Sequence, residues 1–199
     1  MKTMKKTNKF LTFLCTATFF WACNNEIKPK PNAYLRLSYP QPEYQTVQAP
    51  CAFTYEQNTV AKITNVKDCS FQIDYPEMKA KIFVDYEKVT KNNLMNLLKD
   101  AQRLTFEHTV KAEEIQENLI IDNDKKVYGM FYELIGNTAT NVQFYATDSI
   151  NHFIVGSLYF YAKPNFDSII PAAHYIKNDM LKIVETMEWN TPENMTEEK

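Results

Sequence analysis

The 199-residue sequence predicts an α+β fold, in which an antiparallel β-sheet packs with two long amphipathic helices. Apolar residues recur at helical spacing in two segments, near residues 92–108 and 167–189, and strand-like alternation fills the segments around them. The connections between the later strands are short, which makes neighbouring strands antiparallel. Hydrophobic residues make up 45% of the chain and aromatic residues 14%, which is enough apolar material for a packed core.

Residues 1–22 are typical of a secretory signal peptide. Four lysines and no acid occupy residues 1–9, and an apolar run of 13 residues follows up to Ala22, too short to span a membrane. A bacterial lipoprotein signal peptidase requires a small residue directly before a cysteine, so Cys23 is the predicted lipid anchor. The alternative is an ordinary signal peptide followed by a chance cysteine. The polar, proline-rich residues 23–32 are predicted to be a tether.

The remaining composition excludes several classes of protein. Cleavage before Cys23 removes four lysines, which leaves 18 basic against 24 acidic residues and a net charge of −6. An acidic surface argues against binding to nucleic acid or to anionic headgroups. The three glycines cannot form either of the common glycine-rich phosphate-binding motifs. We therefore expect no nucleic acid partner and no cofactor.

Cys51 and Cys69 are the cysteines that remain once Cys15 has left with the signal peptide and Cys23 has taken lipid. An even pair in an oxidising compartment predicts a disulfide. One alternative is two free buried thiols. Another is a metal site, for which two thiols without a nearby histidine are a poor ligand set, so no metal is expected.

Residues 33–189 are predicted to form a single domain, followed by a polar tail at residues 190–199. The first half of this domain is strand-like. Residues 34–37 alternate, and two similar segments, 51–63 and 69–82, indicate two similar strand pairs.

An alternating strand at residues 80–89 precedes the first helix. Asn92 or Asn93 can cap this helix, and its apolar stripe ends at His108. We interpret His108 as a histidine at the edge of the core, with a buried general base as the alternative.

A strand meander and a second helix complete the domain. The predicted strands of the meander are residues 126–135, 139–147 and 152–162. Apolar residues on both faces of the last strand indicate that helices cover both faces of the sheet. The second helix is predicted over residues 167–189. Before the meander, Glu113, Glu114 and Glu117 are interpreted as an acidic helix end, and 122–124 as a solvated turn.

The search for catalytic motifs favours a protein that is not an enzyme. No GxSxG nucleophile motif is present, and the three histidines, His108, His152 and His174, lie on separate predicted elements. The tyrosine-rich strands could bind a glycan or a peptide by stacking, although such residues more often belong to the core.

The order and spacing of several segments resemble one known family, the gliding motility lipoprotein GldD family of Bacteroidetes-type bacteria. The segments are YLRLSYPQPEYQ (34–45), APCAFTYE (49–56), KAKIFVDYEKV (79–89), NNLMNLLKDAQRLTFEHTVKA (92–112), VYGMFYELIGNTATNVQFYATDS (127–149), HFIVGSLYFYAKPNFDS (152–168) and ETMEW (185–189). The lipoprotein start at Cys23 adds to the resemblance, which covers nearly the whole mature chain.

The resemblance implies a non-catalytic cell-envelope lipoprotein that gliding motility requires, in machinery that overlaps the type IX secretion apparatus. Its expected partners are other proteins of that machinery, and its lipid holds it to a membrane, facing the periplasm. The order of elements also resembles the PsbP/Mog1 type of α/β/α sandwich. The competing hypothesis is an envelope ligand-binding module or enzyme whose site is not visible from the sequence.

Two short triplets, at residues 148–150 and 167–169, resemble the Asp-Ser/Thr-apolar O-glycosylation signal of these bacteria. The candidate acceptors are Ser149, in a predicted turn, and Ser168. The alternative for Ser168 is a structural role at a helix N-terminus, together with Asp167.

Overall fold

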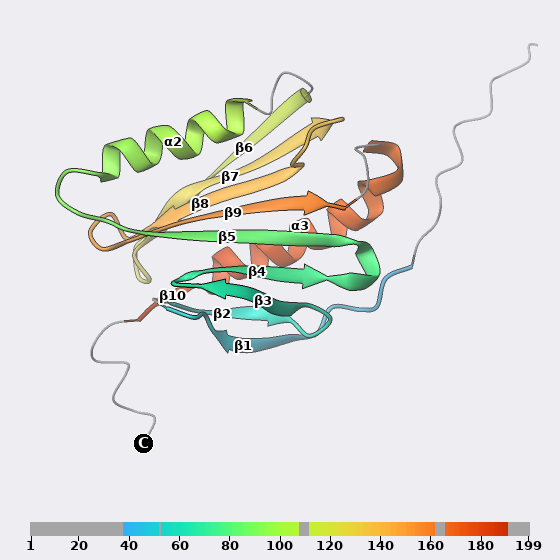
Figure 1. Ribbon diagram of the computed structural model, residues 1–199, viewed down its shortest axis with the longest axis horizontal. Coiled ribbons are helices and arrows are strands. Elements are labelled where there is room, and N and C mark those ends of the chain that lie inside the picture. The colour runs from blue at the N-terminus through green and yellow to red at the C-terminus, as the bar shows by residue number, and fades with distance from the viewer. Residues whose placement is uncertain (1–37, 52, 108–111, 162–165, 191–199) are drawn as a thin grey trace, which may run out of the picture. The chain divides into compact units, whose positions relative to one another are not determined.

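The computed structural model describes residues 38–190 except 52, 108–111 and 162–165, and these residues form the α+β fold that the sequence predicts (Figure 1). Seven antiparallel strands form one sheet, in the order β3 (Lys62–Lys67), β4 (Ser70–Tyr75), β5 (Ala80–Lys88), β9 (His152–Phe160), β8 (Val142–Thr147), β7 (Val127–Gly136) and β6 (Ala112–Asp122). Three more form a second sheet, in the order β1 (Tyr44–Gln48), β2 (Phe53–Asn58) and β10 (Glu188–Trp189). The helices are α2 (Leu94–Glu107), α3 (Phe166–Thr186) and the short 3-10 helix η2 (Pro76–Met78). Among the described residues, no helix is long and apolar enough to cross a lipid bilayer.

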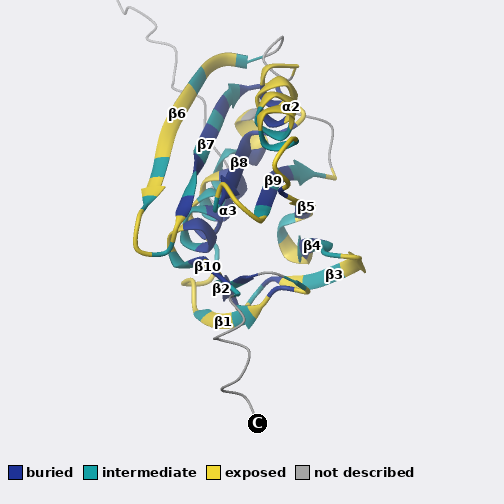
Figure 2. Ribbon diagram, turned by 90° about the vertical axis from the view of Figure 1, so that its left-hand side faces the viewer, coloured by how far each residue is buried: buried dark blue, intermediate teal, exposed yellow. Residues whose placement is uncertain are grey.

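The helices α2 and α3 cover opposite faces of the seven-stranded sheet. Leu97 and Leu98 of α2 pack against a cluster that contains Tyr145 of β8. Ile176 of α3 belongs to the larger core, together with Phe144, the neighbour of Tyr145 on β8. Adjacent residues of a strand face opposite sides of the sheet, so a strand that is covered on both faces is buried along its whole length. All six residues of β8 are buried, and Figure 2 shows this strand in dark blue. The expectation that helices cover both faces is confirmed.

The prediction of a single sheet is wrong, because β1, β2 and β10 form a second one. β1 pairs along one edge of β2 and β10 pairs with Phe53 and Thr54 at the other, whereas β3 pairs with β4. The two similar segments of the sequence therefore differ in structure. β4 and β5 form an antiparallel pair, whereas β2 and β3 lie in different sheets. The strand predicted at residues 34–37 lies outside the described residues.

The second predicted helix, residues 167–189, is too long at its C-terminal end. α3 ends at Thr186, and Trp189 lies in β10, where its backbone pairs with Phe53. The Trp189 ring also meets the Phe53 ring edge-on, with 5.8 Å between the centroids. Tertiary pairing with β2 thus outweighs the helical pattern of this segment.

The interpretation of Glu113, Glu114 and Glu117 as a helix end is also wrong, because all three lie in β6. Among the described strands, β6 lies at the edge of the sheet and pairs with β7 alone, and Figure 2 shows much of it exposed. A strand at the edge of a sheet with little burial can carry polar residues on both faces. The alternation of apolar and polar residues that identifies a strand is then lost. The meander that follows, β7, β8 and β9, is confirmed, as is the turn at residues 122–124.

A buried carboxylate joins α3 to both sheets. Asp179 is only 2% exposed. Its carboxylate accepts hydrogen bonds from the Tyr44 hydroxyl of β1 at 2.7 Å and the Tyr75 hydroxyl of β4 at 3.0 Å. The Asn58 amide of β2 donates to both carboxylate oxygens, at 3.1 and 2.9 Å. Burial raises the pKa of Asp179 above its ordinary value, although these hydrogen bonds oppose the rise.

Replacing Asp179 with alanine is expected to lower the free energy of unfolding by about 3 kcal/mol, because Tyr44, Asn58 and Tyr75 lose their common acceptor. Urea unfolding measures the change. The matched control is Asn178→Ala, an exposed neighbour on α3, which should change stability by less than about 0.5 kcal/mol. Equal, small effects of the two substitutions would show that this cluster does not hold α3.

The contribution of Asp179 to folding stability also depends on pH, because its carboxyl group titrates. Because its pKa is raised above 3.8 in the folded protein, the folded state binds the proton more tightly than the unfolded state. The contribution is therefore fully present below the unfolded pKa and declines as the pH rises through the raised pKa. Over that range, the wild type should lose stability relative to Asp179→Asn, which carries no titratable group there.

Candidate functional site

A cavity of about 770 Å³ lies at one end of the seven-stranded sheet. We name it the end pocket. Four parts of the chain meet there: the end of β5, the β6–β7 turn, the β8–β9 turn and β10. The lining residues are Tyr86, Lys88, Asp124, Lys125, Lys126, Asp148, Ile150, Asn151, His152, Glu188, Trp189 and Asn190.

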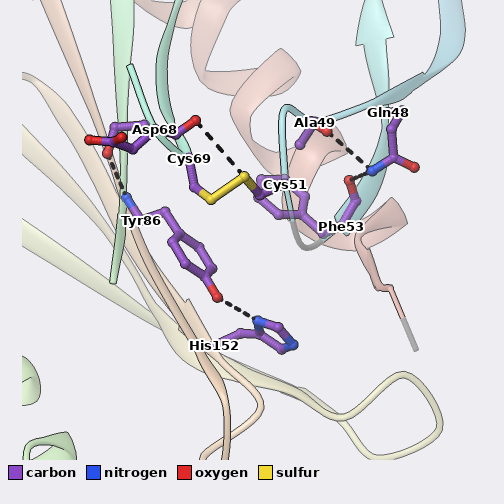
Figure 3. Close-up of a disulfide and its surroundings, with 9 residues drawn as sticks. Gln48, Ala49, Cys51, Phe53, Asp68, Cys69, Tyr86 and His152 are labelled. Carbon is purple, nitrogen blue, oxygen red and sulfur yellow. Dashed lines mark hydrogen bonds between the residues drawn. A yellow bond between two sulfur atoms is a disulfide. The ribbon is translucent and has the colours of Figure 1, made fainter. Parts of the chain in front are cut away.

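Three ring side chains form one wall of the end pocket. The rings of His152 and Trp189 stack, with centroids 5.1 Å apart and planes within 10° of parallel. The Tyr86 hydroxyl and Nδ1 of His152 lie 2.9 Å apart (Figure 3). Trp189 donates its indole N–H to the Lys126 carbonyl oxygen at 3.0 Å, which ties β10 to the β6–β7 turn. Each ring therefore has a fixed position.

The β8–β9 turn is organised by the Asp148 carboxylate. Its Oδ1 accepts the backbone N–H groups of Ile150, Asn151 and His152 at 2.9, 2.8 and 2.8 Å. Burial would raise the pKa of Asp148, but these bonds outweigh burial, and the pKa lies below its ordinary value. Burial lowers the pKa of His152, and the Asp148 charge only partly offsets that effect. His152 is therefore neutral near pH 7.

The charges around the end pocket are mixed. Three lysines, Lys88, Lys125 and Lys126, face three acids, Asp124, Asp148 and Glu188, and the Lys125 ammonium lies 4.0 Å from the Glu188 carboxylate. The His152 ring contacts a tyrosine and a tryptophan rather than a nucleophile or a carboxylate. Within the described residues, no group of histidine, cysteine, aspartate and glutamate side chains could hold a metal ion. This arrangement of rings and mixed charges can bind a molecule.

A disulfide lies close to the end pocket and joins the two sheets. Cys51, before β2, is bonded to Cys69, before β4, with 2.10 Å between the sulfur atoms. The next residue, Ser70, accepts the backbone N–H of Tyr86 at 3.1 Å, and Tyr86 reaches His152 (Figure 3). The disulfide is thus connected to the pocket wall through the hydrogen bonds between Ser70 and Tyr86 and between Tyr86 and His152.

The structure does not bring the other predicted site residues together. Cys23 and His108 lie outside the described residues. His174 is exposed on α3 and lines a different cavity from the end pocket, which contains His152. Ser149 is exposed in the β8–β9 turn with a φ of 67°, and Ser168 is exposed in the first turn of α3. Both glycosylation assignments stay predictions.

Sequence reasoning missed the end pocket, although two of its turns were visible. The predicted turns at residues 122–124 and around Ser149 lie at the same end of the sheet because β6 precedes β7, and β6 was not predicted as a strand. The sequence analysis therefore did not bring the two turns together. The return of Trp189 into β10 was not visible either, because it depends on pairing with β2.

Comparison with known proteins identifies one family. A family model described as gliding motility lipoprotein GldD matches residues 24–189, which include every described strand and helix. No curated protein matches the chain.

Replacing Cys51 and Cys69 together with alanine is expected to lower the free energy of unfolding by about 3 kcal/mol, because the disulfide closes a loop with a sequence separation of 18 in the unfolded chain. Denaturant unfolding measures the loss, with the reduced wild type as the control that should match the double variant. Mass mapping of the exported protein under non-reducing conditions tests the pairing itself. Two freely alkylated thiols there would contradict it.

Proposed function

Because this chain belongs to the gliding motility lipoprotein GldD family, we propose that it acts by binding, as an assembly or interaction component of the gliding and type IX secretion machinery. Its partners in this proposal are other envelope proteins of that machinery, and nucleic acid is not among them. The lipid on Cys23 anchors it to a membrane and the domain faces the periplasm. The α2/sheet/α3 layering supports, as part of the same proposal, a sandwich of the PsbP/Mog1 type.

The observation that carries the proposal is the edge of β6 that no other described strand covers. This strand pairs with β7 from Ala112 to Asp122 and ends the sheet. Leu119 and Ile121, which share one face of the strand, are 67% and 61% exposed. An edge strand with free backbone groups and apolar side chains is a template for a further strand.

The opposite edge of the same sheet is protected, which makes the β6 edge more informative. β3 carries Lys62 and Lys67, and its pairing with β4 shifts register between Thr64 and Lys67. Lysines and bulges are devices that keep an edge strand from pairing with another chain. β6 has neither a lysine nor a proline in Ala112–Asp122, and its register shift, between Ala112 and Glu114, leaves Glu114 to Asp122 in continuous register with β7.

The occupant that we propose for the β6 edge is an extended segment of a partner protein with basic and apolar side chains. The first half of β6 carries Glu113, Glu114 and Glu117, which favour a basic neighbour across the edge. Its second half presents Leu119 and Ile121, which favour an apolar neighbour. A single added strand would meet both requirements.

The second candidate function, a ligand-binding module or an enzyme of the envelope, has the end pocket in its favour. Its volume suits a small ligand. The mixed charges and the partners of the His152 ring favour binding over turnover there. We therefore propose that the protein is not an enzyme.

Introducing lysine at both Leu119 and Ile121 is expected to reduce crosslinking to partner proteins in intact cells by about fivefold and to impair gliding. Because both side chains are exposed, the folded domain should keep its stability within about 0.5 kcal/mol. The matched control is Val66→Lys on the β3 edge, whose side chain is 55% exposed. It should leave crosslinking and gliding unchanged.

Two outcomes would contradict the proposal. Normal crosslinking and gliding in the Leu119→Lys, Ile121→Lys variant would remove the β6 edge as the binding surface. A His152→Gln variant that is folded and abundant, yet unable to support gliding, would instead indicate activity in the end pocket.

Cys23→Ser should release the protein from membranes while leaving the domain folded, because acylation of Cys23 is the proposed anchor. Fractionation of cells after a high-salt wash measures this, and the wash removes protein that only a partner retains. A variant that stays in the washed membranes like the wild type would show that the lipid is not carried by Cys23.

A further inference from the structure

A second cavity lies on the α2 side of the seven-stranded sheet, beside the helix rather than beneath it. α2 packs over β7, β8 and the first part of β9, and leaves the same face of β5 and the second part of β9 uncovered. The cavity there measures about 540 Å³, and we name it the aromatic groove. Its lining residues are Lys81, Phe83, Asp85, Leu104, Ser157, Tyr159, Phe160 and Tyr161.

Two aromatic rings on neighbouring strands line the centre of the aromatic groove. The rings of Phe83 and Tyr159 meet edge to face, with centroids 5.3 Å apart and planes 88° apart. Both side chains are half-buried, so part of each ring faces solvent. An exposed aromatic pair of this kind can take a cation or an apolar group.

The charged groups at one end of the aromatic groove satisfy one another. The Lys81 ammonium lies 3.7 Å from the Asp74 carboxylate and 4.9 Å from the centre of the Tyr161 ring. The Tyr161 hydroxyl donates to Asp74 at 2.8 Å. Burial would raise the pKa of Asp74, but these partners hold it below its ordinary value. This end needs no further ligand.

The carboxylate at the other end has no such partner. Asp85 lies two residues after Phe83 on β5, and no hydrogen bond or ion pair joins it to another described residue. The side chain is exposed, and partial loss of water beside the groove raises its pKa. Burial and the Asp85 charge together raise the pKa of Tyr159, which shows that the carboxylate and this ring interact electrostatically. An exposed carboxylate beside two aromatic rings is open to pairing with a cation from outside the chain.

We propose that the aromatic groove binds an arginine side chain from an extended segment of a partner protein, with the guanidinium paired to Asp85 and lying against Phe83 and Tyr159. Arginine fits better than lysine, because its planar guanidinium can stack on a ring and hydrogen-bond to a carboxylate together. The cavity exceeds the volume of one side chain, which leaves room for the neighbouring residues of the segment. This site is separate from the β6 edge, and the inference does not rest on it.

The test measures binding of a defined peptide, acetyl-Gly-Arg-Gly-amide, to the full-length chain by NMR titration. The peptide should shift the backbone amide signals of Phe83 and Tyr159. Asp85→Asn should weaken its binding by about tenfold, which corresponds to about 1.4 kcal/mol. The matched control, Glu87→Gln, removes an exposed carboxylate from the same strand and should change binding less than about twofold.

Two further measurements separate a binding role from a structural one. Asp85→Asn should unfold at the same urea concentration as the wild type near pH 7, because the side chain is exposed and has no described partner in the fold. Tyr159→Leu, which keeps the carboxylate, should weaken peptide binding by about threefold.

The proposal is overturned if the neutral citrulline peptide binds as tightly as the arginine peptide, or if Asp85→Asn leaves the arginine peptide's affinity unchanged. It is also overturned if Asp85→Asn is clearly less stable than the wild type, since the carboxylate would then be structural. None of these readouts uses gliding or crosslinking, so their failure leaves the proposed function of the β6 edge untouched.

Discussion

The position of α3 depends on one buried carboxylate. Asp179 gathers hydrogen bonds from β1, β2 and β4, so a single side chain fixes the helix to both sheets. α3 leads directly into β10, and the same anchoring therefore delivers Trp189 to its place beside His152. The disulfide between Cys51 and Cys69 adds a second tie between the sheets. The end pocket depends on these two ties together with the strand pairing that holds β5 to β9 and β10 to β2 in register.

The two faces of the seven-stranded sheet differ in how completely they are covered. The α3 face belongs to a core that extends from the second sheet across β4, β5, β7, β8 and β9. On the other face, only Ala101 and Thr105 of α2 are buried, and the helix leaves the aromatic groove open. Stability is therefore concentrated on one side of the sheet, whereas the surfaces with unmet interactions lie on the other side and at the β6 edge.

The periodicity of apolar residues predicted the helices and strands that follow from local sequence. It failed for the strands that are defined by their pairing partners. The meander and both helices follow from apolar spacing, and the coverage of both sheet faces follows from aromatics on both sides of β9. β6 was missed because an edge strand can be acidic, as Glu113, Glu114 and Glu117 show. β10 was missed because the helical stripe reaches Met187, past the end of α3 at Thr186, and the strand is defined by the pairing of Trp189 with Phe53. The end pocket and the aromatic groove form only when distant parts of the chain come together, so no local sequence pattern predicts them.

Asp179 and Asp85 both have raised pKa values, but the two carboxylates play different roles in the fold. Asp179 is buried, meets three donors and so contributes to the fold, whereas Asp85 is exposed and meets none among the described residues. The two edges of the sheet also differ, since β3 carries lysines and β6 carries none. A feature that the fold does not need can serve another role. Both features lie on surfaces that a partner can reach, and binding to a partner would satisfy both.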